Sequence, residues 1–207
     1  MTFTSLAHRA VSHARIYDLV QWLVGVQYVH RRLRRHIDQT ASDASVLDVG
    51  GGTGLLRALW PPQCRYLCVD ADEDKLIGCL QRHPGSAVVR ADATRMPIAS
   101  GSFDAAVCMF VAHHLSDADL EQVIRESARV LKENGKFFLV EPLWRPSRMI
   151  GRLLWRYDRG SFPRSANDLR AALSARFALT RWECFAVLHQ YLLCVGEKRT
   201  ALKRVHE

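Results

Sequence analysis

Short apolar runs alternate with longer amphipathic stretches along the middle of the chain. The apolar runs, rich in Val, Leu, Phe and Cys, occupy residues 45–49, 65–70, 87–92, 103–110 and 135–142. A buried strand of a parallel sheet has such a nearly continuous apolar sequence. Apolar residues at helical spacing predict helices at 72–82 and 117–132, and a further helix is expected to start at 55–59. This strand–helix alternation predicts a parallel sheet with helices on both faces.

Acids and a proline mark where several of these elements begin or end. The acids at 72–74 lie in the first turn of a predicted helix, where the helix dipole favours negative charge. Asp117 is the expected N-cap of the helix at 117–132. Pro142 is expected to end the fifth strand, because proline cannot donate a hydrogen bond to a neighbouring strand.

Both flanks of this alternating core also predict helices. Residues 5–38 read as helical, because apolar residues between Ile16 and Val24 share one helical stripe. The basic run HRRLRRHI closes that segment, where the helix dipole favours cations. On the other side of the core, residues 147–160 predict a basic helix.

The C-terminal part of the chain predicts a helix followed by a hairpin. Residues 165–176 form the helix, with Ser165 and Asp168 at the spacing of a capping box. The runs FALTRWECFAV and HQYLLCVGEK predict two strands joined by a turn at Leu188–His189. Strands joined by so short a turn are antiparallel. The residues after Val195 are expected to form a frayed tail.

The composition is that of a globular protein with a single core. The chain has 207 residues, of which 48% are hydrophobic and 24% charged. The first residues contain no long apolar run, so no secretory signal is expected, and no run approaches the roughly 20 residues of a membrane span. The six cysteines are scattered and form no metal-binding spacing. These features favour a cytoplasmic protein with reduced thiols and no metal site.

The net charge of +8 is distributed unevenly along the chain. Residues 1–45 carry +3, residues 46–143 carry −3 and residues 144–207 carry +8. Basic flanks of this kind can bind a nucleic acid or a membrane surface. They can equally form a solvated arginine-rich surface, which we favour because no nucleic-acid-binding motif accompanies the charge.

A glycine-rich loop follows the first predicted strand, in the stretch SVLDVGGGTG. The dinucleotide fingerprint G-x-G-x-x-G fails here, because its third glycine would fall on Leu55 or Arg57. The phosphate-binding P-loop also fails, because no Gly-Lys-Ser/Thr sequence follows. The stretch instead matches D-x-G-x-G-x-G through Asp48, Gly50, Gly52 and Gly54. Gly51 is not demanded by that pattern, and we interpret it as a permissive filler.

Acids at the next strand ends extend this pattern. Asp70 ends the second strand, and Asp92 ends the third within the run RADATRMPIASGSFD. The fourth strand continues into CMFVAHHL. Together these stretches resemble the class I S-adenosylmethionine-dependent methyltransferases, in particular the small-molecule branch that includes the ubiquinone and menaquinone C-methyltransferases. The resemblance covers roughly residues 15–142, and residues 165–196 in topology only.

The resemblance implies a Rossmann-like fold with S-adenosylmethionine as cofactor. It implies a seven-stranded, mostly parallel sheet of order 3-2-1-4-5-7-6, with the last strand antiparallel and helices on both faces. Asp48 would accept a hydrogen bond from the charged α-amino group of the cofactor. Asp70 would hold both ribose hydroxyls, and Asp92 would accept from the adenine amino group. The other implied cofactor contacts are Tyr17, Ala71, Ala93, Met109 and Phe110, with the three glycines of the loop.

Methyl transfer from a sulfonium is an in-line displacement, for which the protein must align the reactants and exclude water. The chain can also supply a base, and no metal is required. The candidate catalytic residues follow the fourth and fifth strands: His113, His114 and Glu141. An imidazole suits general-base work near neutral pH. Packing or capping is the alternative for the histidines, and pairing with an arginine is the alternative for Glu141. Helix packing is the alternative for Tyr17.

The basic segment 144–164 is the expected neighbour of the acceptor. Its helix places Ile150 and Leu154 on one face and arginines such as Arg152 on another. The apolar face can line an acceptor pocket while the arginines remain solvated. Alternatively, the segment can lie on a membrane surface or bind an anionic acceptor.

We therefore expect one methyltransferase domain over residues 1–207, acting on a small hydrophobic or aromatic acceptor by O- or C-methylation. Its parts would be a helical lid (5–38), a cofactor-binding core (45–142), an insert near the acceptor (143–164), the last helix and hairpin (165–196) and a tail (197–207). One alternative is a protein of this fold that does not methylate, either a cyclase or a cofactor-binding regulatory partner. A nucleic-acid methyltransferase is less favoured, because no N/D-P-P-Y/F motif follows the fourth strand.

Overall fold

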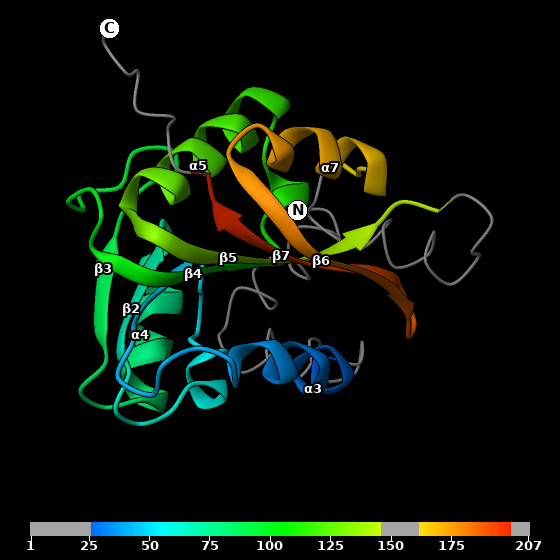
Figure 1. Ribbon diagram of the computed structural model, residues 1–207. Coiled ribbons are helices and arrows are strands. Elements are labelled where there is room, and N and C mark those ends of the chain that lie inside the picture. The colour runs from blue at the N-terminus through cyan, green and yellow to red at the C-terminus, as the bar shows by residue number, and fades with distance from the viewer. Residues whose placement is uncertain (1–25, 146–161, 200–207) are drawn as a thin grey trace, which may run out of the picture.

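Seven strands form a single sheet in a computed structural model that describes residues 26–145 and 162–199 (Figure 1). The strands are β1 (Ser45–Val49), β2 (Arg65–Asp70), β3 (Ala87–Arg90), β4 (Phe103–Met109), β5 (Leu131–Leu143), β6 (Phe177–Ala186) and β7 (Gln190–Lys198). Their order in the sheet is β3-β2-β1-β4-β5-β7-β6. The first five strands are parallel, and β7 is antiparallel to both β5 and β6. The predicted order and the antiparallel hairpin are confirmed.

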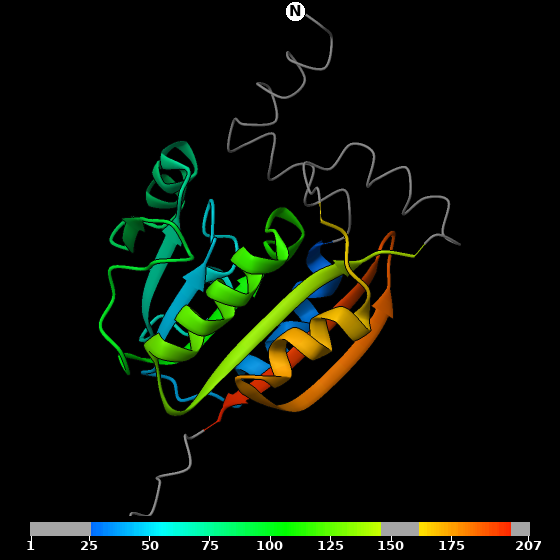
Figure 2. The ribbon, with the colours of Figure 1, turned by 90° about the horizontal axis from the view of Figure 1, so that it is seen from above.

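Helices cover both faces of this sheet. Helices α3 (Val26–Ile37) and α4 (Glu73–Arg82) lie on one face, and α5 (Asp117–Val130) and α7 (Ala166–Ser174) lie on the other (Figures 1 and 2). The strands between these layers are almost fully apolar because each face is buried. Phe137 of β5 stacks on Phe177 on the α5/α7 face, with ring centroids 4.8 Å apart. Its neighbour Phe138 packs on Trp60 on the α3/α4 face.

Polar side chains cap three of the helices. Asp72 caps α4 by accepting from the backbone N–H of Lys75, which agrees with the first-turn acids expected there. Ser165 and Asp168 form the predicted capping box of α7. The cap of α5 is Ser116 rather than Asp117, because Ser116 has extended backbone angles and its hydroxyl accepts from the N–H of Asp119.

Several predicted boundaries are wrong. β3 ends at Arg90 rather than at Asp92, and α5 ends at Val130, so that β5 begins at Leu131 rather than at Gly135. Three further differences have a clear local reason. Instead of the helix expected from residue 55, the structure has one 3₁₀ turn, η1 (Arg57–Leu59). Pro61 disfavours a helical conformation at the residue before it, and Trp60 is indeed extended. Pro142 does not end β5, because β4 stops at the partner of Val140 and leaves Pro142 beside β7 alone. The expected tail after Val195 is also wrong at its start, since β7 continues to Lys198.

Several sequence predictions fall outside the described residues. These are Tyr17, the helices expected before residue 26 and the whole of the basic helix expected at 147–160. All six cysteines are described and are free thiols, of which Cys184 alone is exposed. In the described ranges no helix is long and apolar enough to span a membrane.

Candidate active site

The carboxyl ends of the parallel strands bring together the loops that carry the predicted site residues. In open α/β sheets this edge forms the crevice in which ligands bind. The loop after β1 holds the glycines, Asp70 is the last residue of β2, and Asp92 lies in the loop after β3. The loop after β4 contains a second 3₁₀ turn, η2 (Ala112–His114). Glu141 lies near the end of β5.

The glycine loop is held against the end of β2 by backbone hydrogen bonds. The N–H groups of Gly50 and Gly51 both donate to the carbonyl of Val69, at 2.8 and 3.1 Å. The N–H of Gly52 donates to Oδ2 of Asp70 at 2.9 Å. Gly50, Gly52 and Gly54 all have positive φ angles, which only glycine adopts at low cost. The three glycines of the sequence pattern are therefore the ones that the turn requires.

Gly51 is needed for a different reason, so its interpretation as a permissive filler is wrong. Its φ angle is not in the left-handed region, but a Cβ at this position would lie 2.4 Å from Oδ2 of Asp48. The same Cβ would lie 2.7 Å from the sulfur of Cys68. The loop therefore passes so close over β1 and β2 that no side chain fits between them.

Asp48 lies beneath this loop as a buried carboxylate, with 1% of its surface exposed. The Tyr66 hydroxyl donates to its Oδ2. Its Oδ1 has no hydrogen-bond partner among the residues that the structure describes. Burial raises the pKa of Asp48 to about 7, and the Tyr66 hydrogen bond partly opposes that rise. A buried acceptor of this kind requires a donor, which a bound ligand can supply.

Asp70 and Asp92 follow neighbouring strands and lie at the same edge. Asp70 joins two loops, because its Oδ1 accepts from the N–H of Asp72 at 2.9 Å while Oδ2 accepts from Gly52. Its carbonyl also accepts from the N–H of Ala91, just before Asp92. Asp92 is exposed, and two hydrogen bonds from Thr94 lower its pKa. Ala71 is exposed and Ala93 is half-buried beside them.

An ion pair on α5 fixes the loop that Asp92 begins. Glu126 accepts from the N–H of Met96 at 3.0 Å, and it pairs with Arg129 at 2.7 Å. Arg129 in turn donates to the carbonyls of Met96 and Ile98. The guanidinium lowers the pKa of Glu126. The sequence predicted no role for Glu126 or Arg129. Their spacing of three residues on a helix is the one feature that indicates the ion pair.

Phe110 leaves β4 in an unusual conformation. Its φ angle is +59°, which is rare for a residue other than glycine and is costly for a bulky one. Its N–H still donates to the carbonyl of Val140 at 2.9 Å. The half-buried ring lies 5.6 Å from that of Tyr191, centroid to centroid. Met109, half-buried, precedes it as the last residue of β4.

Glu141 and His113 form a buried pair, with 1% and 4% of their surfaces exposed. Nδ1 of His113 donates to Oε1 of Glu141. The same carboxylate accepts from the backbone N–H groups of Ala112 and His113, at 3.1 and 2.9 Å. Among the residues that the structure describes, Glu141 therefore bonds to this loop and not to an arginine. The exposed ring of His114 lies 4.0 Å from that of His113.

Arg164 holds the same loop from its other side. It is 8% exposed, and its guanidinium donates to the carbonyl of Ala112 at 2.6 Å and to that of Leu115 at 2.8 Å. It also pairs with Asp117 at the start of α5. The sequence offered no signal for this role, because Arg164 is one of many arginines in a basic segment. The residues described include no group of three or more His, Cys, Asp or Glu that could hold a metal ion.

Comparisons with known proteins find similarity to methyltransferases. The family described as "Methyltransferase domain" matches residues 47–139. The human thiol S-methyltransferase TMT1A is 36% identical over 47% of this chain and 42% of its own length. The ubiquinone/menaquinone biosynthesis C-methyltransferase UbiE of Hahella chejuensis is 32% identical over 63% of this chain and 56% of its own length. The chain thus spans about half the length of these curated relatives.

Solved structures share the fold at low sequence identity. The YcgJ protein of Bacillus subtilis superposes with a TM-score of 0.70 at 18% identity, covering 84% of this chain and 100% of that one. A geranyl diphosphate methyltransferase solved with GPP and sinefungin superposes with a TM-score of 0.68 at 14% identity. The match covers 84% of this chain and 77% of that one. At these identities the likeness concerns the fold alone.

The close packing around Gly51 predicts that Gly51→Ala destabilises the protein. The added methyl must displace the Asp48 carboxylate or the Cys68 thiol, which costs about 1–3 kcal/mol in a packed site. Urea denaturation measures this free energy. Gly85→Ala is the control, because a Cβ there meets nothing within 4 Å and only its positive φ opposes the change. A smaller loss for Gly51→Ala than for Gly85→Ala would contradict the expectation.

Proposed function

We propose that the chain is a class I S-adenosylmethionine-dependent methyltransferase that transfers a methyl group from S-adenosylmethionine to a small hydrophobic or aromatic acceptor. The observation that supports this most directly is the unpartnered buried oxygen of Asp48 beneath the glycine loop. Asp70 and Asp92 extend the same edge with two further carboxylates. Their arrangement fits a ligand with a cation at one end and hydroxyl and amino groups further along.

The residues of this edge fit the cofactor group by group. The α-ammonium would satisfy Oδ1 of Asp48, which is a charge-assisted hydrogen bond. Asp70 already accepts two N–H bonds, but a carboxylate has about four lone-pair positions and can still accept from the ribose hydroxyls. Asp92 would accept from the adenine amino group. Ala71 and Ala93 would lie next to the adenine, where a larger side chain would intrude. Met109 and Phe110 would lie along the cofactor.

The chain's own contribution to transfer is alignment, exclusion of water and removal of a proton. The bound cofactor supplies an activated methyl group, so the acceptor must be aligned with it. We propose His113 as the base that takes the acceptor's proton. Glu141 is then a positioning residue. Its carboxylate accepts a hydrogen bond from Nδ1 of His113 and so fixes the tautomer in which Nε2 of His113 is the basic nitrogen. His114 is the alternative base, since it is exposed and adjacent.

Apolar residues around this edge support an apolar acceptor. Trp144 and Phe162 are exposed at 37% and 41%, and they lie at the two ends of the segment proposed to line the acceptor pocket. Phe162 donates its N–H to the carbonyl of His113 at 3.0 Å, so the C-terminal end of this segment contacts the proposed base. Relatives named for thiol and for ubiquinone/menaquinone substrates also support a small-molecule acceptor.

The ribose assignment predicts that Asp70→Ala weakens binding of S-adenosylhomocysteine at least tenfold, because two charge-assisted hydrogen bonds are lost. Isothermal titration calorimetry measures the affinity. Asp74→Ala is the matched control, since Asp74 is an exposed acid in the first turn of α4. Equal affinity of the Asp70 variant and the wild type would contradict the assignment, and so would a wild type that does not bind.

The environment of Asp48 predicts a pH-dependent affinity for S-adenosylhomocysteine. Its raised pKa of about 7 means that Asp48 becomes neutral as the pH falls below 7, and a neutral carboxyl no longer attracts the ligand's ammonium. Affinity should therefore fall by up to about tenfold per pH unit as the pH decreases below 7. Asp48→Asn should bind weakly and show a flatter profile between pH 6 and 8. A wild-type profile as flat as that of the variant would exclude this role.

The transfer itself is tested with methyl-labelled S-adenosylmethionine and cell-lysate fractions. We expect label in the small-molecule or lipid fraction. His113→Gln should reduce labelling about 100-fold or more, a typical contribution of general-base catalysis, without changing the affinity for S-adenosylhomocysteine. Label confined to nucleic acid would reject the proposed acceptor. Tight cofactor binding without label in any fraction would favour the non-methylating alternative.

A further inference from the structure

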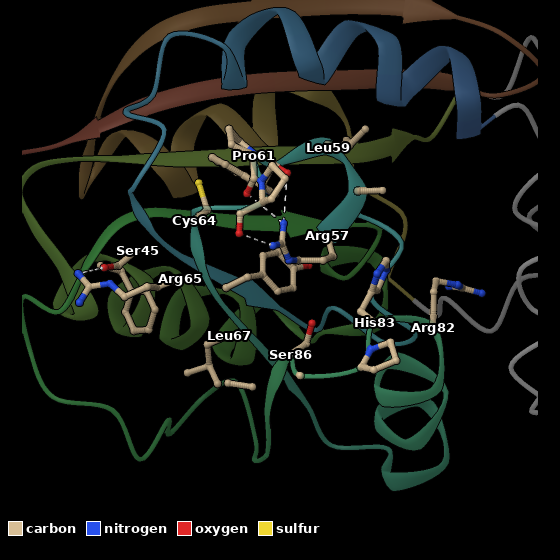
Figure 3. Close-up of a pocket in the computed structure, with 18 of the residues that line it drawn as sticks. Ser45, Arg57, Leu59, Pro61, Cys64, Arg65, Leu67, Arg82, His83 and Ser86 are labelled. Atoms are coloured by element: carbon tan, nitrogen blue, oxygen red, sulfur yellow. Dashed lines mark hydrogen bonds between the residues drawn. The ribbon is translucent and has the colours of Figure 1, made fainter.

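A cavity lies at the opposite edge of the sheet from the glycine loop. It has a volume of about 1170 Å³ (Figure 3). The first residues of four parallel strands line it: Ser45, Arg65, Ala87 and Phe103. It therefore opens at the amino ends of β1 to β4, whereas the cofactor crevice of such folds lies at the carboxyl ends. None of the residues assigned above to the cofactor or to catalysis lines it.

Cationic side chains dominate the wall of this cavity. The lining cations are Arg34, Arg57, Arg65 and Arg82, and Asp38 is the one carboxylate among the lining residues. Arg34, Arg57 and Arg65 form no ion pair within the ranges 26–145 and 162–199. A cleft lined by charges of one sign concentrates the electrostatic potential and attracts ions of the opposite sign.

Arg57 is oriented by groups that leave its charge uncompensated. Its Nη1 donates to the carbonyls of Trp60 and Pro61, both at 3.2 Å, and its Nη2 donates to that of Pro62 at 3.1 Å. Its guanidinium carbon lies 5.6 Å from the ring centroid of Tyr66. Carbonyl dipoles and an aromatic face hold a guanidinium in place but contribute no net negative charge.

Arg34 and Arg65 are exposed and able to move toward a ligand. Figure 3 shows Arg57 between Arg65 on one side and His83 and Arg82 on the other. Arg65 donates to the Ser45 hydroxyl at 2.7 Å. Arg34 makes only a long contact of 3.4 Å with the carbonyl of Ala58. Rearranging these long side chains breaks few interactions.

We propose that this cavity binds a small molecule that carries phosphate groups. The guanidinium fork matches phosphate oxygens in pairs, and several guanidiniums around one cleft suit a group with more than one negative charge. Apolar walls formed by Leu67, Pro84 and Phe103 can cover the rest of the molecule. The proposal is independent of methyl transfer and of the acceptor.

The cavity wall also contacts the cofactor loop, which the test must take into account. Nη1 of Arg82 donates to both the carbonyl and the hydroxyl oxygen of Thr53, at 3.0 Å each. A ring nitrogen of His83 lies 3.0 Å from the carbonyl oxygen of Gly54. A phosphate probe must therefore be shown to bind outside the cofactor crevice.

The test is isothermal titration calorimetry of the full chain with inorganic pyrophosphate. We expect binding by the wild type that saturating S-adenosylhomocysteine does not displace. The double variant R34A/R65A should lose at least tenfold in affinity, because each lost guanidinium removes a charge-assisted hydrogen bond. These exposed residues are preferred to Arg57, whose bonds hold its own turn. Arg125→Ala, an exposed arginine paired with Glu121 on α5, is the matched control and should bind like the wild type.

Four outcomes would overturn the proposal. The first is no wild-type binding at millimolar pyrophosphate. The second is an equal loss in Arg125→Ala, which would indicate a general charge effect. The third is displacement by S-adenosylhomocysteine, which would place the probe in the cofactor crevice. The fourth is a single-stranded RNA that binds and depends on Arg34 and Arg65 while pyrophosphate does not bind, which would assign the surface to nucleic acid.

Discussion

The burial of Asp48 under the glycine loop is the constraint on which the rest of the site depends. All five residues of β1 are buried, and Asp48 faces the α3/α4 side of the sheet beside Tyr66. A carboxylate in that position is costly unless donors satisfy it. The Tyr66 hydroxyl donates to one oxygen, and the other has no partner in the part of the chain that the structure describes. The same carboxylate excludes any side chain at Gly51. Asp48 therefore determines both the position of the glycine loop and the negative charge beneath it.

The other loops at this edge are held by acids and arginines in complementary roles. Carboxylates accept from loop N–H groups: Asp70 from Gly52, and Glu141 from Ala112 and His113. Arginines donate to loop carbonyls, as Arg164 does to Ala112 and Arg129 does to Met96. Loops that leave a sheet have unpaired backbone groups of both kinds, and buried ones must be satisfied. Each of these hydrogen bonds therefore stabilises both a loop conformation and the charge of the ionic side chain that forms it.

The amino and carboxyl ends of the parallel strands form two edges of the sheet that differ in charge. Residues 46–143 form most of both edges. Residues 46–143 carry a net charge of −3, yet they supply Arg57, Arg65 and Arg82 to the cavity at the amino edge. Their acids Asp48, Asp70 and Asp92 lie at the carboxyl edge. The segregation follows from the direction of the chain, because every parallel strand begins at one edge and ends at the other. A cationic ligand group and an anionic ligand would thus find their sites at opposite ends of the same strands.

The sequence alone determined the features that depend on neighbouring residues. Apolar runs located the strands, acids and Ser165 located helix starts, and the three glycines located the turn, because strand burial, capping and φ are local properties. The tertiary structure decided the contacts between distant residues. His113 meets Glu141 across 28 positions, and Arg164 meets Ala112 across 52. The need for Gly51 is of the same kind, since β2 brings Cys68 beneath it. These contacts depend on the register and crossing of β1, β2, β4 and β5, which local sequence patterns do not specify.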